Sequence, residues 1–178
     1  MSTESGASTP VSDAAATGVQ VVPFRDEHRD AFEALNRDWL ERFGLLEDGD
    51  LPYLEDPRRT ILDPGGAVLC ALADGEVMGT VAVIPHGAGT FELAKLAVAA
   101  SARRRGIGRR LVEAAIALAR TAGATTLTLS SNHQLRDAIR LYESFGFAHV
   151  ASPAGGVEYD TADVFMVLTL GAPGLPAA

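Results

Sequence analysis

Hydrophobic positions in several segments of the chain recur at steps of three and four residues, the spacing of one face of a helix. In residues 26–43 this apolar stripe consists of Phe32, Leu35, Trp39 and Phe43. Gly44 follows and is expected to end the helix. Residues 107–121 and 134–145 show the same spacing. The pattern therefore predicts three amphipathic helices.

A fourth, short helix is predicted within residues 48–56. Asp50 can cap its first turn, and Pro52 comes early, where a missing N–H costs little. Pro57 is expected to stop the run.

Short apolar or β-branched runs between these segments predict strands. Residues 67–73 and 77–84 are joined by Asp74-Gly75, a pair typical of tight hairpins because both central positions take positive φ. Further strands are predicted at residues 90–98, 125–129, 147–150 and 164–170, and residues 19–24 form an apolar opening before the first helix. The order of elements predicts an α/β (α+β) fold, with a mixed central β-sheet flanked by helices on both faces.

Length and composition fit one folded domain. The chain has 178 residues, of which 47% are hydrophobic, enough for one core but not for two full-sized ones. We expect the domain to span residues 19–170. Residues 1–18 and 171–178 lack periodicity and are predicted to be flexible tails.

The charge balance and the few sulfur and imidazole groups exclude several classes of protein. A net charge of -8 disfavours a nucleic-acid-binding module. Cys70 is the single cysteine and is predicted to be a buried apolar residue, while the four histidines lack metal-ligand spacing. No apolar run reaches about 18 residues and no signal segment is evident. A cytoplasmic protein without a membrane partner is expected.

The connection between residues 90–98 and residues 107–121 carries the strongest chemical signal. It contains Gly106 and Gly108, spaced so that free backbone N–H groups at a helix N-terminus can point at an anion. The same stretch gathers five of the 15 basic residues, Arg103, Arg104, Arg105, Arg109 and Arg110. Arginines here oppose the helix dipole by about 0.3 to 1 kcal/mol each, so a bound polyphosphate is the favoured explanation. The alternative is a tight connection with solvated arginines.

The motif Arg103-x-x-Gly106-x-Gly108 resembles the acetyl-coenzyme A motif of the GNAT family of N-acetyltransferases. Farther along, Asn132 follows a predicted strand, and Leu141-Tyr142 precedes a Gly-Phe pair, as in the second cofactor-side segment of that family. The resemblance covers about residues 67–170. It implies an enzyme that transfers an acetyl group from acetyl-coenzyme A to an amine by direct attack in a ternary complex.

The resemblance also implies where the cofactor binds. In this family the strand before the turn carries a bulge and diverges from its neighbour, which frees backbone N–H groups for pantetheine and the thioester carbonyl. Asn132 would hydrogen-bond the pantetheine arm, or it could be a helix N-cap before Gln134. The implied cofactor-binding residues are Leu96, Ala97, Val98, Arg103, Arg104, Arg105, Gly106, Ile107, Gly108, Arg109 and Asn132.

Two residues match catalytic positions of the family. Glu92 lies eleven residues before Arg103 and is the expected base that deprotonates the acceptor amine. Alternatively, it faces solvent or pairs with Lys95, the only lysine, which is expected to order Glu92 or touch the substrate. Tyr142 is the expected acid for the departing thiolate, or a packed core tyrosine. His133 is expected to be solvated.

The acceptor is the least determined part of the hypothesis. A small-molecule amine is favoured over a peptide or protein amine. Acidic residues within residues 26–56 could steer a cationic acceptor, or they could form a solvated face. A non-catalytic module that binds or senses acyl-coenzyme A is the alternative function. A homodimer could form through an exposed strand at residues 164–170.

Overall fold

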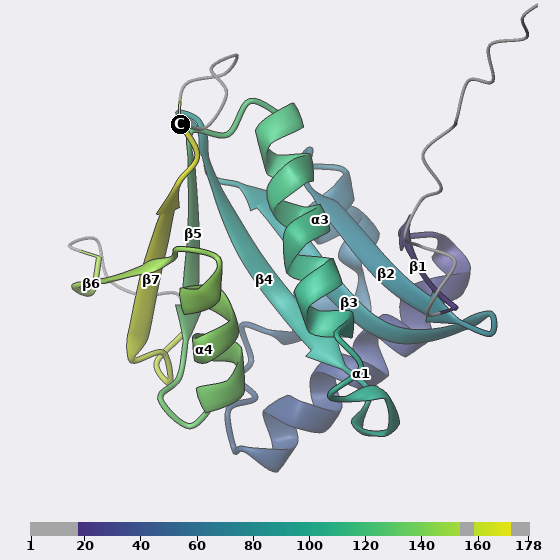
Figure 1. The fold of residues 1–178 in the computed structure, drawn as a ribbon. Helices are drawn as coiled ribbons and strands as arrows, with labels where there is room; N and C mark the ends of the chain where they lie inside the picture. The colour runs from purple at the N-terminus through teal and green to yellow at the C-terminus, as the bar shows by residue number, and fades with distance from the viewer. Residues whose placement is uncertain (1–17, 154–158, 172–178) are drawn as a thin grey trace, which may run out of the picture.

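A seven-stranded mixed β-sheet forms the centre of the computed structural model, which describes residues 18–153 and 159–171 (Figure 1). The strand order is β1-β2-β3-β4-β5-β7-β6. All neighbouring strands are antiparallel except β4 and β5. The strands are β1 (Val19–Pro23), β2 (Ala67–Ala73), β3 (Glu76–Pro85), β4 (Thr90–Val98), β5 (Thr126–Ser131), β6 (Ala148–Val150) and β7 (Val164–Thr169).

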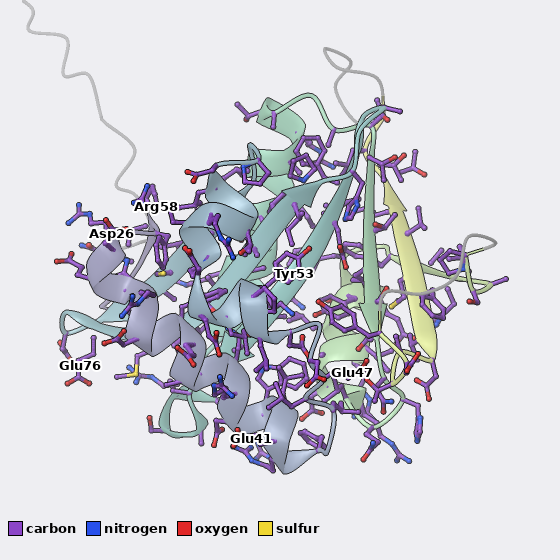
Figure 2. All side chains as sticks on the ribbon, turned by 180° about the vertical axis from the view of Figure 1, so that it is seen from behind. Asp26, Glu41, Glu47, Tyr53, Arg58 and Glu76 are labelled. Carbon is purple, nitrogen blue, oxygen red and sulfur yellow. The ribbon has the colours of Figure 1, made fainter. Side chains whose placement is uncertain are left out.

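Helices cover both faces of this sheet. Helices α3 and α4 lie on one face, and α1 and α2 lie on the other (Figures 1 and 2). The helices are α1 (Arg29–Arg42), α2 (Leu51–Glu55), α3 (Ile107–Thr121) and α4 (Arg136–Ser144), with short helical turns η2 (Asp26–His28), η3 (Arg58–Leu62) and η4 (Ala100–Ala102). The predicted fold class is therefore confirmed. The two predicted tails lie almost entirely outside the described residues.

Each face of the sheet has its own hydrophobic core. Leu93, Leu111 and Leu127 are fully buried between the sheet and the α3–α4 layer. Phe32 and Cys70 belong to the second core, beneath α1 and α2. Burial raises the pKa of the Cys70 thiol to about 12, so this cysteine is the buried small residue that the sequence predicted.

Helix α1 buries a different stripe from the predicted one. Its buried residues are Phe32, Asn36 and Leu40, whereas Phe43 lies at the surface. A polar contact accounts for the different buried stripe. The Asn36 amide Nδ2 donates hydrogen bonds to the Phe32 carbonyl at 2.9 Å and to Thr80 Oγ1 on β3 at 3.1 Å, so a polar residue occupies the centre of the contact with the sheet.

The segment around α2 also departs from the prediction. Asp50 does not cap the helix with its side chain, because its carboxylate is engaged by other partners that are described below. Pro57 does not end helical structure either. It precedes the π-helical turn η3 at Arg58–Leu62, which the sequence pattern did not reveal.

Strands β4 and β5 are joined at one end and diverge toward the other (Figure 1). Their parallel pairing covers only Thr90–Glu92 of β4 and Thr126–Thr128 of β5. From Leu93 onward β4 has no register partner in β5. Strand β7 lies between β5 and β6, which corrects the expectation of an exposed strand at residues 164–170. The divergence leaves a backbone edge of β4 open beside α4 (Figure 1).

Candidate active site

Strand β4 carries a β-bulge next to its unpaired edge. Ala94 pairs with Ala82 and Ala97 pairs with Thr80, so one extra residue of β4 is accommodated between these pairs. Lys95, in that interval, has a φ of 52°, in the left-handed region. The bulge implied by the family resemblance is present. Together with the divergence of β5, it makes the backbone around Leu96 available to an extended ligand.

The turn from β4 into α3 provides helix-start amides for an anion. Gly106 is the N-cap of α3 and has a φ of 74°, which an L side chain rarely adopts. The N–H groups of the first turn that follows, at Ile107, Gly108 and Arg109, lack helical partners by geometry. The Ile107 side chain is buried, so Ile107 can offer only its backbone. A Cβ at Gly108 would lie 3.3 Å from Leu141 Cδ2, so glycine lets α3 approach α4.

The five clustered arginines divide into two groups. Arg103, Arg104 and Arg105 are exposed and make no hydrogen bond or ion pair with any residue that the structure describes. Arg109 donates to Ser144 Oγ at 3.0 Å and lies over the Phe145 ring, whereas Arg110 donates to the Val19 carbonyl at 3.2 Å. Arg110 therefore ties α3 to β1, and three arginines remain free to bind phosphate groups.

The residues that follow β5 hold two loops together. The Asn132 amide donates to the Thr161 carbonyl at 2.7 Å and its Oδ1 accepts the Gln134 N–H at 3.0 Å. The N-cap of α4 is Leu135 rather than Asn132, so Asn132 holds the turn before the helix and is not the helix N-cap that the sequence offered as the alternative. Contact of Asn132 with pantetheine stays a prediction. His133 is exposed, as expected, and its hydrogen bond lowers the pKa of Asp163.

Tyr142 of α4 lies in the core on the α3–α4 face. Only 7% of its surface is exposed, and its ring packs against that of Phe147, with the ring centroids 5.8 Å apart. Burial raises the pKa of the Tyr142 phenol, so the hydroxyl stays protonated at neutral pH. The packing contact predicted as the alternative role is present, and the phenol keeps the proton that an acid needs.

Glu92 points to the opposite face, into a pocket of about 300 Å³ over the half of the sheet that α1 and α2 do not reach. Figure 2 shows that these two helices do not extend over β5 and β7. Glu92 Oε2 lies 2.8 Å from Nε2 of His86, and the carboxylate side chain is only 13% exposed. The pocket is lined by His86, Glu92, Thr128, Leu129, Ser130, Val150, Pro153, Phe165, Met166 and Val167.

His86 was missed by sequence reasoning, and the hairpin register could have revealed it. Ile84 is opposite Glu92 across the β3–β4 hairpin, so residues just beyond Ile84 lie near the carboxylate. The expected pairing of Glu92 with Lys95 is wrong. The carboxylate contacts the His86 imidazole instead, and the lysine ammonium contacts Asp50.

Lys95 instead forms a buried ion pair with Asp50. Lys95 Nζ lies 2.6 Å from Asp50 Oδ1, and the two side chains are 7% and 4% exposed. Nζ also donates to the Tyr159 hydroxyl at 3.2 Å and lies over the rings of Tyr53 and Tyr159, 5.4 and 5.0 Å from their centroids. Sequence reasoning missed these partners, which come from distant segments.

The acids of the α1–α2 region are largely neutralised. Arg37 bonds Glu33 at 2.8 Å and lies 3.3 Å from Glu55, and Arg42 bonds Asp38 in the same way along α1. These pairs support the solvated-face alternative over the steering of a polycation.

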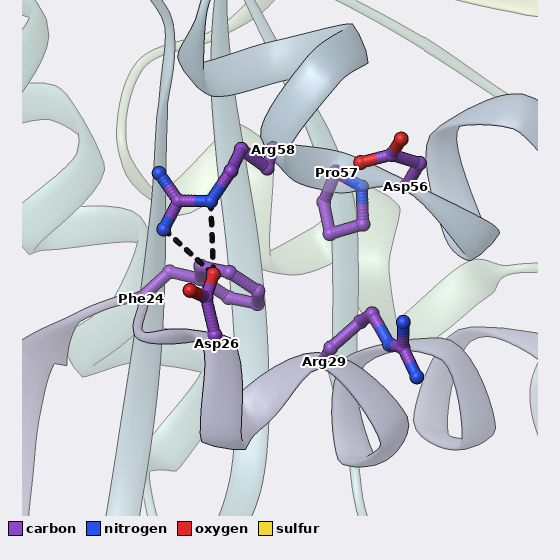
Figure 3. Close-up of a pocket in the computed structure, with 6 residues that line it drawn as sticks. All are labelled: Phe24, Asp26, Arg29, Asp56, Pro57 and Arg58. Carbon is purple, nitrogen blue, oxygen red and sulfur yellow. Dashed lines mark hydrogen bonds and ion pairs between the residues drawn. The ribbon is translucent and has the colours of Figure 1, made fainter.

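A second pocket, of about 240 Å³, lies at the start of α1 and is lined by Phe24, Asp26, Arg29, Asp56, Pro57 and Arg58 (Figure 3). Arg58 closes it with two hydrogen bonds to Asp26 Oδ1, at 2.9 and 2.6 Å. Because Arg58 and Asp26 are satisfied by each other, this pocket offers a ligand little polar binding capacity.

The unpaired β4 edge, the bulge and the glycine turn at the start of α3 lie along one continuous stretch of a split sheet. The family model of the acetyltransferase (GNAT) family matches residues 25–147. The chain belongs to this family and is a GNAT N-acetyltransferase, which confirms the predicted family and enzyme class.

Relatives with curated sequences agree with this assignment. An uncharacterized N-acetyltransferase of Schizosaccharomyces pombe is 33% identical over 66% of this chain and 75% of its own length. The uncharacterized N-acetyltransferase YvbK of Bacillus subtilis is 31% identical over 55% of this chain and 65% of its own length.

Solved structures share the fold. A GNAT-family acetyltransferase from Staphylococcus aureus has a TM-score of 0.78 at 18% identity and covers 85% of this chain and 99% of its own. The putative acetyltransferase yncA of Salmonella typhimurium, solved with its cofactor acetyl-CoA, has a TM-score of 0.67 at 22% identity. The match covers 90% of this chain and 98% of that one. Among the described residues, no helix is long and apolar enough to span a membrane.

Proposed function

We propose that this enzyme transfers the acetyl group of acetyl-coenzyme A to the primary amine of a small molecule, by direct attack in a ternary complex. The observation that carries the proposal is the arrangement along one strand. The unpaired, bulged part of β4 leads into the Gly106 turn, and Glu92 of the same strand faces the pocket on the other side of the sheet.

The residues present fit acetyl-coenzyme A, the cosubstrate of the family. The first-turn amides at Ile107–Arg109 suit the pyrophosphate, and the unengaged guanidinium groups of Arg103, Arg104 and Arg105 suit phosphate oxygens. The open backbone of Leu96–Val98 suits the amides of the pantetheine arm. Bound acetyl-coenzyme A supplies an activated acetyl thioester there.

The backbone N–H of Leu96 would stabilise negative charge that develops on the thioester carbonyl oxygen. An amide fixed in a bulge needs no rearrangement during the reaction, and one such donor contributes on the order of 3 to 4 kcal/mol to lowering a barrier. The left-handed conformation of Lys95 orients this amide, so the bulge serves catalysis as well as packing.

Glu92 would take the proton from the acceptor ammonium, because only the neutral amine is a nucleophile. The carboxylate is largely shielded from water and faces the pocket, and the half-exposed His86 ring beside it can exchange protons with solvent. On the other face Tyr142 would donate its phenolic proton to the leaving sulfur, which becomes a stronger base as the thioester breaks.

The pocket supports a small acceptor that carries a single charge. Among the described lining residues Glu92 is the one carboxylate, and Phe165, Val167 and Val150 provide apolar surface. The acids nearby on α1 and α2 are paired with arginines and offer little to a polycation. A monocationic amine with an apolar body fits this chemistry.

Calorimetric titration of acetyl-coenzyme A would test the cofactor site. The wild type is compared with the double variant Arg104→Ala/Gly106→Trp, and with the matched control Arg120→Ala/Gly123→Trp at the other end of α3. Gly123 also has a positive φ and open space around its Cβ position. Micromolar binding that is lost only in the first variant supports the site.

A thiol-release screen then tests turnover with phenethylamine, spermidine, kanamycin and a lysine-containing peptide. Turnover of phenethylamine above the others supports the proposal. Preference for the peptide would indicate a protein acceptor, and binding of acetyl-coenzyme A without turnover of any amine would indicate a sensing module.

A further inference from the structure

Lys95 is the only lysine of the chain, and its ammonium group is buried against Asp50. Burying a charged pair is costly unless its geometry and additional hydrogen bonds compensate. Here the geometry is close, the Tyr159 hydroxyl accepts a second hydrogen bond, and two aromatic rings face the ammonium. Such a pair is better explained by a need for position than by stability alone.

Lys95 is also held through its backbone. Its carbonyl accepts a hydrogen bond from Thr80 Oγ1 at 3.1 Å, and Thr80 Oγ1 in turn accepts one from the buried Asn36 amide. The side chain is fixed by Asp50 and Tyr159. The bulge that presents the Leu96 amide is therefore anchored by α1 and β3 at its backbone and by two further segments at its side chain.

The two segments that hold the side chain are bonded to each other. The second oxygen of Asp50 accepts the Glu47 N–H at 3.0 Å. The Glu47 carboxylate accepts the N–H groups of Asp160 and Thr161, at 3.0 and 2.8 Å, and the Thr161 hydroxyl at 2.6 Å. The loop before α2 and the segment before β7 thus form one unit, which contacts the bulge through Lys95.

We propose that Lys95 is a positioning residue for acetyl transfer, one that fixes the acceptor side of the enzyme relative to the bulge that holds the thioester. This inference rests on the proposed function. Glu92 lies three residues earlier on the same strand, so a shift of the bulge changes the spacing between base, amine and thioester. Misplacement by about 1 Å can cost about 100-fold in rate.

Kinetics of Lys95→Met, Asp50→Asn and the double variant test the proposal. They are measured with the amine of the thiol-release screen that the wild type acetylates fastest. Each single variant is expected to lower kcat at least tenfold and to leave the calorimetric Kd for acetyl-coenzyme A within about threefold. The double variant should be no slower than the slower single variant, because the two residues act as a unit. Tyr159→Phe, which removes the hydrogen bond from Lys95 Nζ and leaves the ion pair with Asp50, should have a smaller effect in the same direction.

The ion pair between Asp26 and Arg58 provides the matched control, because it also joins distant segments but lies at the other pocket (Figure 3). Asp26→Asn and Arg58→Met should leave kcat unchanged. Three outcomes would overturn the proposal. One is that the losses of kcat in Lys95→Met and Asp50→Asn add up in the double variant. The others are an unchanged kcat in Lys95→Met and an equal loss of kcat in the control pair.

A spectroscopic measurement covers the case in which no panel amine turns over. In ¹⁵N-labelled protein the single lysine gives one side-chain ammonium signal, which should shift when acetyl-coenzyme A is added and should be lost or displaced in Asp50→Asn. A signal that does not move on saturation overturns the role of Lys95 alone. Wild-type protein that does not bind acetyl-coenzyme A overturns the proposed function, and this inference with it.

Discussion

The donor side of the enzyme, residues 96–109, and the acceptor side, the pocket at Glu92 with the Lys95–Asp50 pair, are built in different ways. The proposed donor side is one continuous stretch of backbone amides and arginines, of which Arg103, Arg104 and Arg105 make no hydrogen bond or ion pair with a described residue. The acceptor side joins side chains 45 and 64 residues apart in the sequence, and Glu47 reaches a partner 114 residues away. A shared cofactor can be bound by a local motif, whereas the acceptor site depends on tertiary structure.

Replacement of Glu92 should cause the largest loss and would show whether the acceptor side carries the chemistry. Glu92→Gln keeps the shape but removes the base, so kcat/KM for the amine should fall by about 100- to 10,000-fold. Thiol-release kinetics measure this, and calorimetry should give an unchanged affinity for acetyl-coenzyme A. Glu113→Gln, an exposed change on α3, is the control. Full activity in Glu92→Gln would remove the residue from the mechanism.

Tyr142→Phe should have the next largest effect and tests the donor side. Loss of the phenolic proton should lower kcat by about 10- to 100-fold, at the lower end of acid–base contributions, because water can substitute in part. The ring would still pack on Phe147, so the melting temperature should change little. Phe147→Leu, which alters the packing partner, should show the reverse pattern. A large loss of stability in Tyr142→Phe would make the packing role the dominant one.

Two glycines that flank α3, one before it and one after it, separate conformational strain from cofactor binding. Gly106→Ala and Gly123→Ala both place a side chain at positive φ in open space, so each should destabilise the protein by about 1 kcal/mol, as thermal or urea unfolding would measure. Only Gly106→Ala should also weaken acetyl-coenzyme A binding in calorimetry. Equal affinities in the two variants would contradict an anion-binding role for the Gly106 turn.

The smallest effect concerns Glu47 and the pH dependence of stability. Burial opposes ionisation of this carboxyl, but hydrogen bonds from the Thr161 hydroxyl and from the Thr161 and Asp160 amides outweigh it and lower the pKa of Glu47 below its ordinary 4.5. A carboxylate whose pKa is depressed by folding stabilises the protein above the pKa of the unfolded chain, and this contribution disappears as the pH falls through the folded value.

Glu47→Gln should therefore melt at a lower temperature than the wild type at pH 7, and the gap should narrow below about pH 4.5. Differential scanning calorimetry across this pH range measures the gap. Glu76→Gln, an exposed change in the β2–β3 hairpin (Figure 2), should show a much smaller gap. A constant gap at all pH values would contradict the linkage to the Glu47 carboxylate.

Much of the fold followed from local signals. The predicted bounds of residues 67–73, 90–98 and 107–121 agree with β2, β4 and α3, because a hairpin turn, a buried strand and an amphipathic helix each have a short-range pattern. The positive φ predicted at Asp74 and Gly75 is also present. The strand and the glycine turn of the proposed cofactor site were therefore both predicted from the sequence.

Side-chain pairing on the acceptor side could not be predicted in the same way. A three-residue spacing on one strand suggested that Lys95 and Glu92 pair, but Lys95 contacts Asp50 from another segment, and His86 contacts Glu92. The buried stripe of α1 shifted because Asn36 has a partner on β3. Both outcomes depend on contacts between segments far apart in the chain.

The sheet consists of two antiparallel units that are joined only by the short parallel contact between β4 and β5. Strands β1–β4 are paired among themselves, as are β5, β7 and β6, and α3 packs mainly on the first unit. Opening between β4 and β5 breaks few backbone hydrogen bonds, although both units contribute side chains to the hydrophobic core beneath α3 and α4. In amide hydrogen exchange, the backbone bonds across Thr90–Glu92 should then exchange by a lower-energy opening than those inside β2–β3.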